Sequence, residues 1–184
     1  MNNVYLTSVI KQLNYYKSLA DKTFVQLSDE ELNWQYTKDS NSIATIVKHM
    51  NGNMLSRWTN FLTEDGEKPW RTRDAEFETA YLTKEELVNI WETGWTCVFN
   101  AITPLTDDDL ERIIYIRNEG HTVTDAINRQ LAHYPYHIGQ IVLIGTQLKG
   151  ENWHSLSIPK GQSNSYNADK FSQPKDISHF TDKA

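Results

Sequence analysis

The chain has 184 residues, a formal net charge of -6 at pH 7 and one cysteine, Cys97. This length predicts a single domain, residues 1–184, large enough to bury a core without disulfides or a structural metal. The acidic balance, with no cluster of lysine and arginine, argues against a nucleic-acid surface and against a polybasic membrane anchor. One cysteine allows no internal disulfide, and neither a signal peptide nor a membrane-spanning apolar stretch is evident. We therefore expect a soluble cytoplasmic protein.

The first part of the chain predicts two long helices. Residues 4–27 contain neither glycine nor proline, and their apolar residues recur at near-helical spacing. Residues 28–31 form a capping box that should open a short helical turn. A run of N-cap residue types precedes the second long helix, whose apolar stripe begins at residue 43 and ends near Thr63. The polar stretch up to residue 77 contains a glycine and a proline and is interpreted as a loop.

The second part predicts two more long helices and a tail. A capping box at residues 83–86 opens the third helix, and Pro104 stops it. Residues 110–121, rich in β-branched side chains, indicate a short extended segment and a turn. Residues 122–149 form the last helix. We predict an all-α, up-and-down four-helix bundle with a core of about 4–150, that small extended segment, and an irregular C-terminal extension at 151–184.

The last helix carries the motif HYPYHIGQ, residues 133–140. His133 and His137 are four residues apart, so both imidazoles lie on one side of the helix and could bind one ion. Helical angles place them on the flank of the apolar stripe, where a pocket wall is expected. Pro135 lies between them, removes the bond to the carbonyl of Leu131 and costs roughly 3 kcal/mol unless compensated. Its kink either bends the helix around the core or helps to aim the imidazoles.

A catalytic zinc-type site normally has three protein ligands, and His49 is the candidate third. On the second helix it lies off the apolar stripe, among small and polar residues: Thr45, Gly52, Asn53 and Ser56. Such neighbours are typical of a wet cavity lining and equally of a solvated helix face. The three other histidines, His121, His154 and His179, are interpreted as solvated or locally hydrogen-bonded.

Three stretches of the chain resemble a known family. They are IVKHMNGNMLSRWTNFLTEDGEKPWRTRDAEF, INRQLAHYPYHIGQIVLIGTQLKG and WHSLSIPKGQSNSYN. These stretches resemble the DinB-like (DinB/YfiT) superfamily of bacterial metal-binding four-helix bundles and, within it, the DUF1572 group. The metal site of that superfamily is a histidine triad, one from the second helix and two from the last. The matching positions here are His49, His133 and His137.

The resemblance implies a divalent metal ion, with zinc, nickel, iron and manganese not distinguished. Some members are similar to thiol-dependent S-transferases that use a low-molecular-weight thiol such as bacillithiol, and others to metal-dependent hydrolases. We therefore expect a metal-dependent enzyme of small-molecule metabolism or detoxification, with S-transfer as the leading reaction. A hydrolase and a non-catalytic metal-binding bundle remain the alternatives. A homodimer fits the superfamily, and apolar surplus such as Trp91 and Trp95 would permit one.

Two polar residues near the expected ion are candidates for a catalytic or orienting role. Gln140 lies three residues past His137 on the same flank, and Asn53 lies one turn past His49. Each could orient a ligand or bind substrate, or could be an ordinary polar residue at a helix edge.

No acidic residue falls on these two helix faces at a spacing that marks a general base, which disfavours the hydrolase. Asp74 and Glu76 in the loop could fold over the site, although nothing in the sequence requires it. Four arginines are available to hold an anionic thiol, but each is interpreted more readily as a surface or helix-pairing residue: Arg57, Arg71, Arg73 and Arg129.

Overall fold

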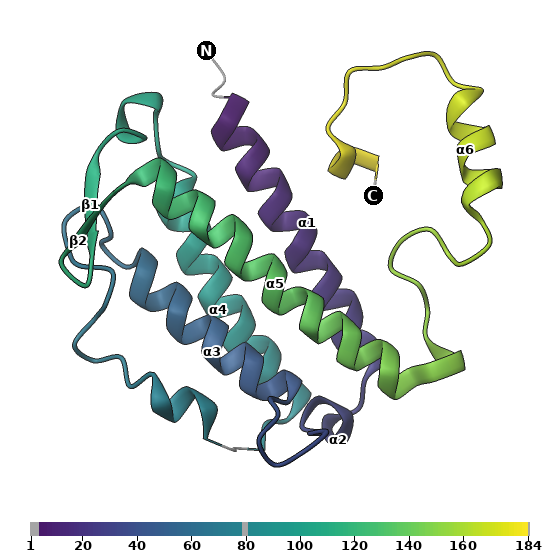
Figure 1. Cartoon of the computed structure of the whole chain (residues 1–184), viewed down its shortest axis with the longest axis horizontal. Coiled ribbons are helices and arrows are strands. Elements are labelled where there is room, and N and C mark those ends of the chain that lie inside the picture. Colours follow the sequence, from purple (N-terminus) through teal and green to yellow (C-terminus); the bar gives the residue numbers. More distant parts are fainter. Residues whose placement is uncertain (1–3, 79–80, 184) are drawn as a thin grey trace.

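The computed structural model describes residues 4–78 and 81–183. Within these residues the chain is mainly helical, with six α-helices and one two-stranded sheet. The four long helices are α1 (Val4–Gln26), α3 (Ile43–Trp58), α4 (Lys84–Ile102) and α5 (Val123–Lys149) (Figure 1). The short ones are α2 (Asp29–Leu32) and α6 (Ser163–Phe171), and single 3-10 turns occur at Asp74–Phe77, Asp107–Asp109, Gly150–Asn152 and Phe180–Lys183. All four long helices expected from the sequence are therefore present.

The long helices pack as two pairs, α1 against α5 and α3 against α4, and the pairs meet where α3 contacts α5 and α1 contacts α4. The core lies between them. Trp91 and Trp95 of α4 are 1% and 0% exposed, and Trp91 meets Phe24 of α1 with ring centroids 5.4 Å apart. These two tryptophans are thus core residues and do not form an apolar surplus at the surface; the homodimer itself stays a prediction.

Helix starts follow the predicted capping signals. The backbone N–H of Ser28 donates to Glu31 at 2.8 Å and that of Thr83 donates to Glu86 at 2.9 Å, completing both capping boxes. The end of α3 differs from the prediction. The helix stops at Trp58, because Thr59 is extended and Asn60 has a left-handed φ of 48°. Phe61 still reaches the core from the turn that follows, which explains why the apolar stripe seemed to continue.

The predicted extended segment is a hairpin of β1 (Ile113–Ile116) and β2 (Glu119–Thr122). Its two turn residues, Arg117 and Asn118, have φ of 56° and 62°, as a two-residue type I′ turn requires. The carboxylate of Asp65 accepts both of their backbone N–H groups at 2.8 Å. This contact ties the loop after α3 to the hairpin and brings Arg117 towards α3.

The tail was predicted to be irregular, and this is wrong for α6. That helix has no buried residue, so its sequence has no apolar stripe from which a helix could be predicted. Figure 1 shows α6 standing clear of the four long helices and the C-terminal turn returning towards α1. There Lys11 pairs with Asp182 at 2.6 Å. In the part of the chain that the structure describes, no helix combines the length and apolar character needed to cross a bilayer.

Candidate metal centre

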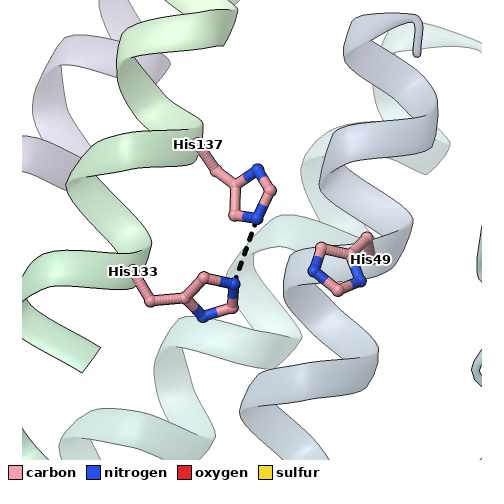
Figure 2. Close-up of side chains that lie close together, drawn as sticks. All are labelled: His49, His133 and His137. Atoms are coloured by element: carbon pink, nitrogen blue, oxygen red, sulfur yellow. Dashed lines mark hydrogen bonds between the residues drawn. The ribbon is translucent and has the colours of Figure 1, made fainter. Parts of the chain in front are cut away.

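The three histidines singled out in the sequence lie together. His49 comes from the middle of α3, and His133 and His137 lie one turn apart on α5. Each offers one ring nitrogen, and these nitrogens all lie within 4.8 Å of one another. Figure 2 shows both α5 imidazoles reaching towards α3, where His49 lies. His49 is only 7% exposed, so its polar neighbours line an interior site and the alternative of a solvated helix face was wrong.

The other ring nitrogen of each histidine meets a side-chain oxygen. The three Nδ1 contacts are His49 to Glu76 Oε2 at 2.9 Å, His133 to Gln130 Oε1 at 3.1 Å, and His137 to Gln140 Oε1 at 2.8 Å. Carboxylate and amide oxygens only accept hydrogen bonds, so each Nδ1 carries the hydrogen and donates it. Each Nε2 is then left with a lone pair, which is the form that binds a metal.

The free nitrogens face each other at a spacing that suits an ion. Nε2 of His133 and Nε2 of His137 are 3.1 Å apart (Figure 2). Two imidazole nitrogens at about 2.0–2.1 Å from one tetrahedral ion would be separated by about 3.3 Å. The dashed line in Figure 2 marks this contact as a hydrogen bond, which requires a hydrogen on one Nε2; because the Nδ1 contacts place the hydrogens on the other nitrogens, two lone pairs meet here and a cation between them removes their repulsion. The donor set, three imidazole nitrogens, therefore fits a divalent metal of the later first row.

The protonation states agree with this arrangement. Burial, together with the neighbouring His137 and His49, lowers the pKa of His133 from 6.5 to about 4. Burial also lowers the pKa of His137, although its hydrogen bond to Gln140 opposes the change. Both α5 imidazoles are consequently neutral at pH 7 and need not lose a proton to bind a metal.

Glu76 is the residue that sequence reasoning weighed but did not place. It lies in the 3-10 turn Asp74–Phe77, with its Oε1 accepting from Arg71 Nε at 2.7 Å and its Oε2 from Arg71 Nη2 at 3.0 Å. Burial raises the pKa of Glu76, but the hydrogen bonds from His49 and Arg71 outweigh it, and the net result is a lowered pKa. The Glu76 side chain is thus an ionised carboxylate with both oxygens hydrogen-bonded. It can orient His49, but it has no free oxygen to accept a proton from a substrate.

The loop reaches His49 because α3 leaves space for it. Gly52 faces Glu76, and a Cβ at that position would lie 2.7 Å from the carboxylate carbon of Glu76. Any larger residue would displace the carboxylate. The glycine that the sequence grouped among small residues near His49 therefore has a specific packing role.

The two other candidate residues occupy different positions. Gln140 accepts a hydrogen bond from His137 and can therefore orient its ring. Gln130 does the same for His133 but was not proposed from the sequence. The signal was present, because Gln130 lies three residues before His133 just as Gln140 lies three residues after His137. Asn53 contacts none of the imidazoles by hydrogen bond. It accepts from the hydroxyl of Tyr134 at 3.3 Å, and that hydroxyl accepts from Trp58 Nε1 at 2.9 Å.

A cavity of about 390 Å³ adjoins the triad. His49 and His133 form part of its wall, together with Asn53, Gln130 and five arginines: Arg57, Arg71, Arg73, Arg117 and Arg129. Four of these arginines were interpreted as surface or helix-pairing residues; Arg73 and Arg129 are indeed exposed, whereas the side chains of Arg57 and Arg71 are buried, and all four lie at one cavity. All lining residues fall between residues 49 and 133, so the C-terminal tail does not line this cavity.

The comparison with known families covers most of the chain. A family model described as "Protein of unknown function (DUF1572)" matches residues 1–162. The chain belongs to the DUF1572 family. The match includes α1 to α5 and ends just before α6. No curated protein and no solved structure matches the chain. Membership of DUF1572 assigns no activity, so the case for a function depends on the site.

Proposed function

We propose that this DUF1572 protein is a metal-dependent enzyme acting on small molecules, with His49, His133 and His137 as ligands of one divalent ion. One observation carries the proposal: three imidazoles from two helices bring one ring nitrogen each within 4.8 Å of one another, while the other nitrogen of each ring is held by a side-chain oxygen. A divalent ion bound there would lower the pKa of a coordinated thiol or water and make it a nucleophile near neutral pH.

The protein's own residues supply orientation and access. Glu76, Gln130 and Gln140 fix the imidazole rings, and such partners typically change metal affinity by 10–100-fold when removed. Three protein ligands leave further coordination positions free, as in catalytic zinc sites. The adjoining cavity provides room for a small molecule beside His49 and His133. The resemblance to the DinB-like superfamily, with its up-and-down four-helix bundle and histidine triad, supports the same proposal.

Thiol-dependent S-transfer, with a cofactor of the bacillithiol kind, is the reaction that we favour. The only carboxylate hydrogen-bonded to the triad in the described chain is Glu76, and Arg71 and His49 occupy both of its oxygens. A hydrolase would therefore lack a free general base, whereas a thiol that is already ionised needs none. The arginines of the cavity wall suit an acidic thiol cofactor.

Metal analysis tests the ligand assignment. Protein purified without a histidine tag should contain about one divalent ion per chain by mass spectrometry. His49→Ala, His133→Ala and His137→Ala should each lose it. His154→Ala is the matched control, since His154 is exposed and lies outside the cluster. If wild-type protein binds no stoichiometric metal after incubation with zinc, nickel, iron or manganese, or if the triad variants bind it as well as the control, the assignment fails.

Activity assays separate the reactions. Metal-loaded protein would be given epoxide and quinone electrophiles, esters and amides, each with and without added bacillithiol or cysteine. Turnover that requires the thiol supports S-transfer. Turnover without a thiol would replace S-transfer by hydrolysis, and a loaded protein inactive on the whole panel would favour a non-catalytic metal-binding role.

A further inference from the structure

The chain's arginines are concentrated at one place. The sequence contains six arginines, and five of them line the cavity beside the triad, together with no lysine. The sixth, Arg112, lies outside the cavity and pairs with Asp109. This gathering occurs in a protein whose net charge is -6, so it does not follow from an overall basic composition.

The carboxylates at this wall are too few to balance the arginines. Among the described residues, Glu67 pairs with Arg57 and Arg117 at 3.1 Å and lies 3.8 Å from Arg71. Glu76 pairs with Arg71. Two carboxylates thus face five guanidinium groups, and the wall keeps an excess of positive charge.

Two of the arginines have no carboxylate partner within the described chain. Arg73 and Arg129 are exposed, and neither forms an ion pair there. Arg73 has its guanidinium over the ring of Phe77, 5.1 Å from the centroid, which leaves its N–H edge available. Arg129 precedes Gln130 on α5. Ion pairing within the protein therefore explains three of the five arginines and leaves these two without a partner.

Arg57 contributes a buried positive charge to the same wall. It is 6% exposed, and its Nη1 donates to the carbonyl of Gly66 and to Glu67. Its Nε is buried and has no hydrogen-bond partner. Burial lowers the pKa of Arg57, and the nearby charges of Arg71 and Arg129 add to this. Arg57 thus places a desolvated positive charge in the cavity wall; its Nε has almost no accessible surface, so a bound anion would interact with Arg57 through its charge and not through that N–H group.

We infer that this cavity is an oxyanion-binding subsite, which holds a phosphate or carboxylate group of the small molecule that acts at the triad. Guanidinium groups present planar, paired donors that match both of these oxyanions, which explains why arginine rather than lysine lines the wall. A volume of about 390 Å³ is within the range of small-molecule sites. The inference rests on the proposed function only in placing the reactive end of that molecule at the metal.

The test uses metal-free protein, so that no anion binds through the ion. Wild-type protein treated with a chelator and checked for residual metal would be titrated with sodium phosphate and, separately, sodium succinate, in Tris chloride of low ionic strength. Isothermal calorimetry measures the dissociation constant. Arg73→Gln and Arg129→Gln should each raise it about tenfold, the effect of losing one charge-assisted hydrogen bond. Arg112→Gln removes the same charge outside the cavity and should leave it unchanged.

The outcomes are distinct. Saturable phosphate binding that the two cavity variants weaken supports the subsite with a phosphate group, and the same result with succinate alone supports it with a carboxylate. Failure of wild-type protein to bind either anion overturns the inference, as does equal weakening by Arg112→Gln. Metal content is measured in parallel on wild-type protein. Metal without anion binding would sink the subsite alone, and anion without metal binding would sink the proposed enzyme alone.

Discussion

Replacing Glu76 by glutamine should weaken metal binding although Glu76 is not a metal ligand. The change keeps the size of the side chain and removes its charge. Glu76 accepts from three N–H groups, one on His49 and two on Arg71. A glutamine amide has one oxygen and one NH2 group, so at least one of these contacts becomes a donor facing a donor. With the NH2 group at the Oε2 position His49 loses its acceptor, and with the NH2 group at the Oε1 position Arg71 Nε meets a donor and His49 keeps only a neutral amide oxygen, a weaker acceptor than the carboxylate.

The size of the effect follows from burial. Loss of an orienting partner lowers metal affinity by about 10–100-fold, or about 1.4–2.7 kcal/mol. The side chains of Arg71 and Glu76 are 2% and 10% exposed, so their ion pair is buried, and breaking such a pair costs about 3–5 kcal/mol. Arg71 retains Glu67 at 3.8 Å, which puts the expected loss of unfolding free energy near the lower end, about 3 kcal/mol.

Two measurements check this reasoning. Competition with a chromophoric chelator gives the zinc affinity, and urea unfolding of the metal-free protein gives the stability. Asp74→Asn is the control, since Asp74 is exposed in the same 3-10 turn and should change neither quantity. Folded Glu76→Gln protein with wild-type zinc affinity would refute the orienting role.

Three further substitutions test other features of the site. Gly52→Ala should displace Glu76 and lower zinc affinity. Its control is Gly139→Ala on α5, where a Cβ meets nothing within 4 Å; this change should leave zinc affinity unchanged and stabilise the helix by up to about 1 kcal/mol. Equal zinc affinities of the two variants would contradict the packing argument. Pro135→Ala restores a helical N–H and should raise the unfolding free energy by up to about 3 kcal/mol in urea, and no gain would mean that the surrounding structure already compensates the proline. Because the pKa of His133 is lowered to about 4 in the folded protein, only the unfolded state protonates this imidazole as the pH falls from 6.5 towards 4. The unfolding free energy of metal-free wild type, measured in urea, should therefore fall more between pH 7 and pH 4.5 than that of His133→Gln. Equal losses in the two proteins would contradict this.

Local signals predicted the helices well, because each signal acts within one or two turns. The capping boxes at Ser28 and Thr83 depend on a residue three positions away and form as expected. The α5 histidines are a property of one helix, so their spacing alone places them on one face. His49 was named as the candidate third ligand from its small and polar neighbours on the second helix, but that pattern left a solvated helix face open, and the family resemblance was needed to match His49 to the triad.

The loop between α3 and α4 could not be predicted in the same way. Glu76 reaches His49 across 27 positions, and no regular pattern connects them. The conformation of the loop depends on distant contacts instead, such as Asp65 with the hairpin turn and the N–H of Gly66 with the carbonyl of Tyr115 at 2.8 Å. Such contacts exist only once the hairpin and α3 lie side by side. The clustering of the arginines could not be predicted for the same reason, since three of the five lie in this loop or in the hairpin turn.

Net charge is a sum and does not say where charges lie, so an acidic chain argues against a nucleic-acid surface but not against a site for a small anion. Three neutral imidazoles leave the double charge of a bound ion uncompensated, and the arginine-lined wall adds to it. Metal and anion should therefore strengthen each other's binding, by the same factor for each because the coupling is reciprocal. Phosphate titrated into zinc-loaded protein should bind more tightly than into metal-free protein, and less so at high salt. Equal dissociation constants would mean that the cavity and the triad act independently, and the molecule held by the arginines would then have to react elsewhere.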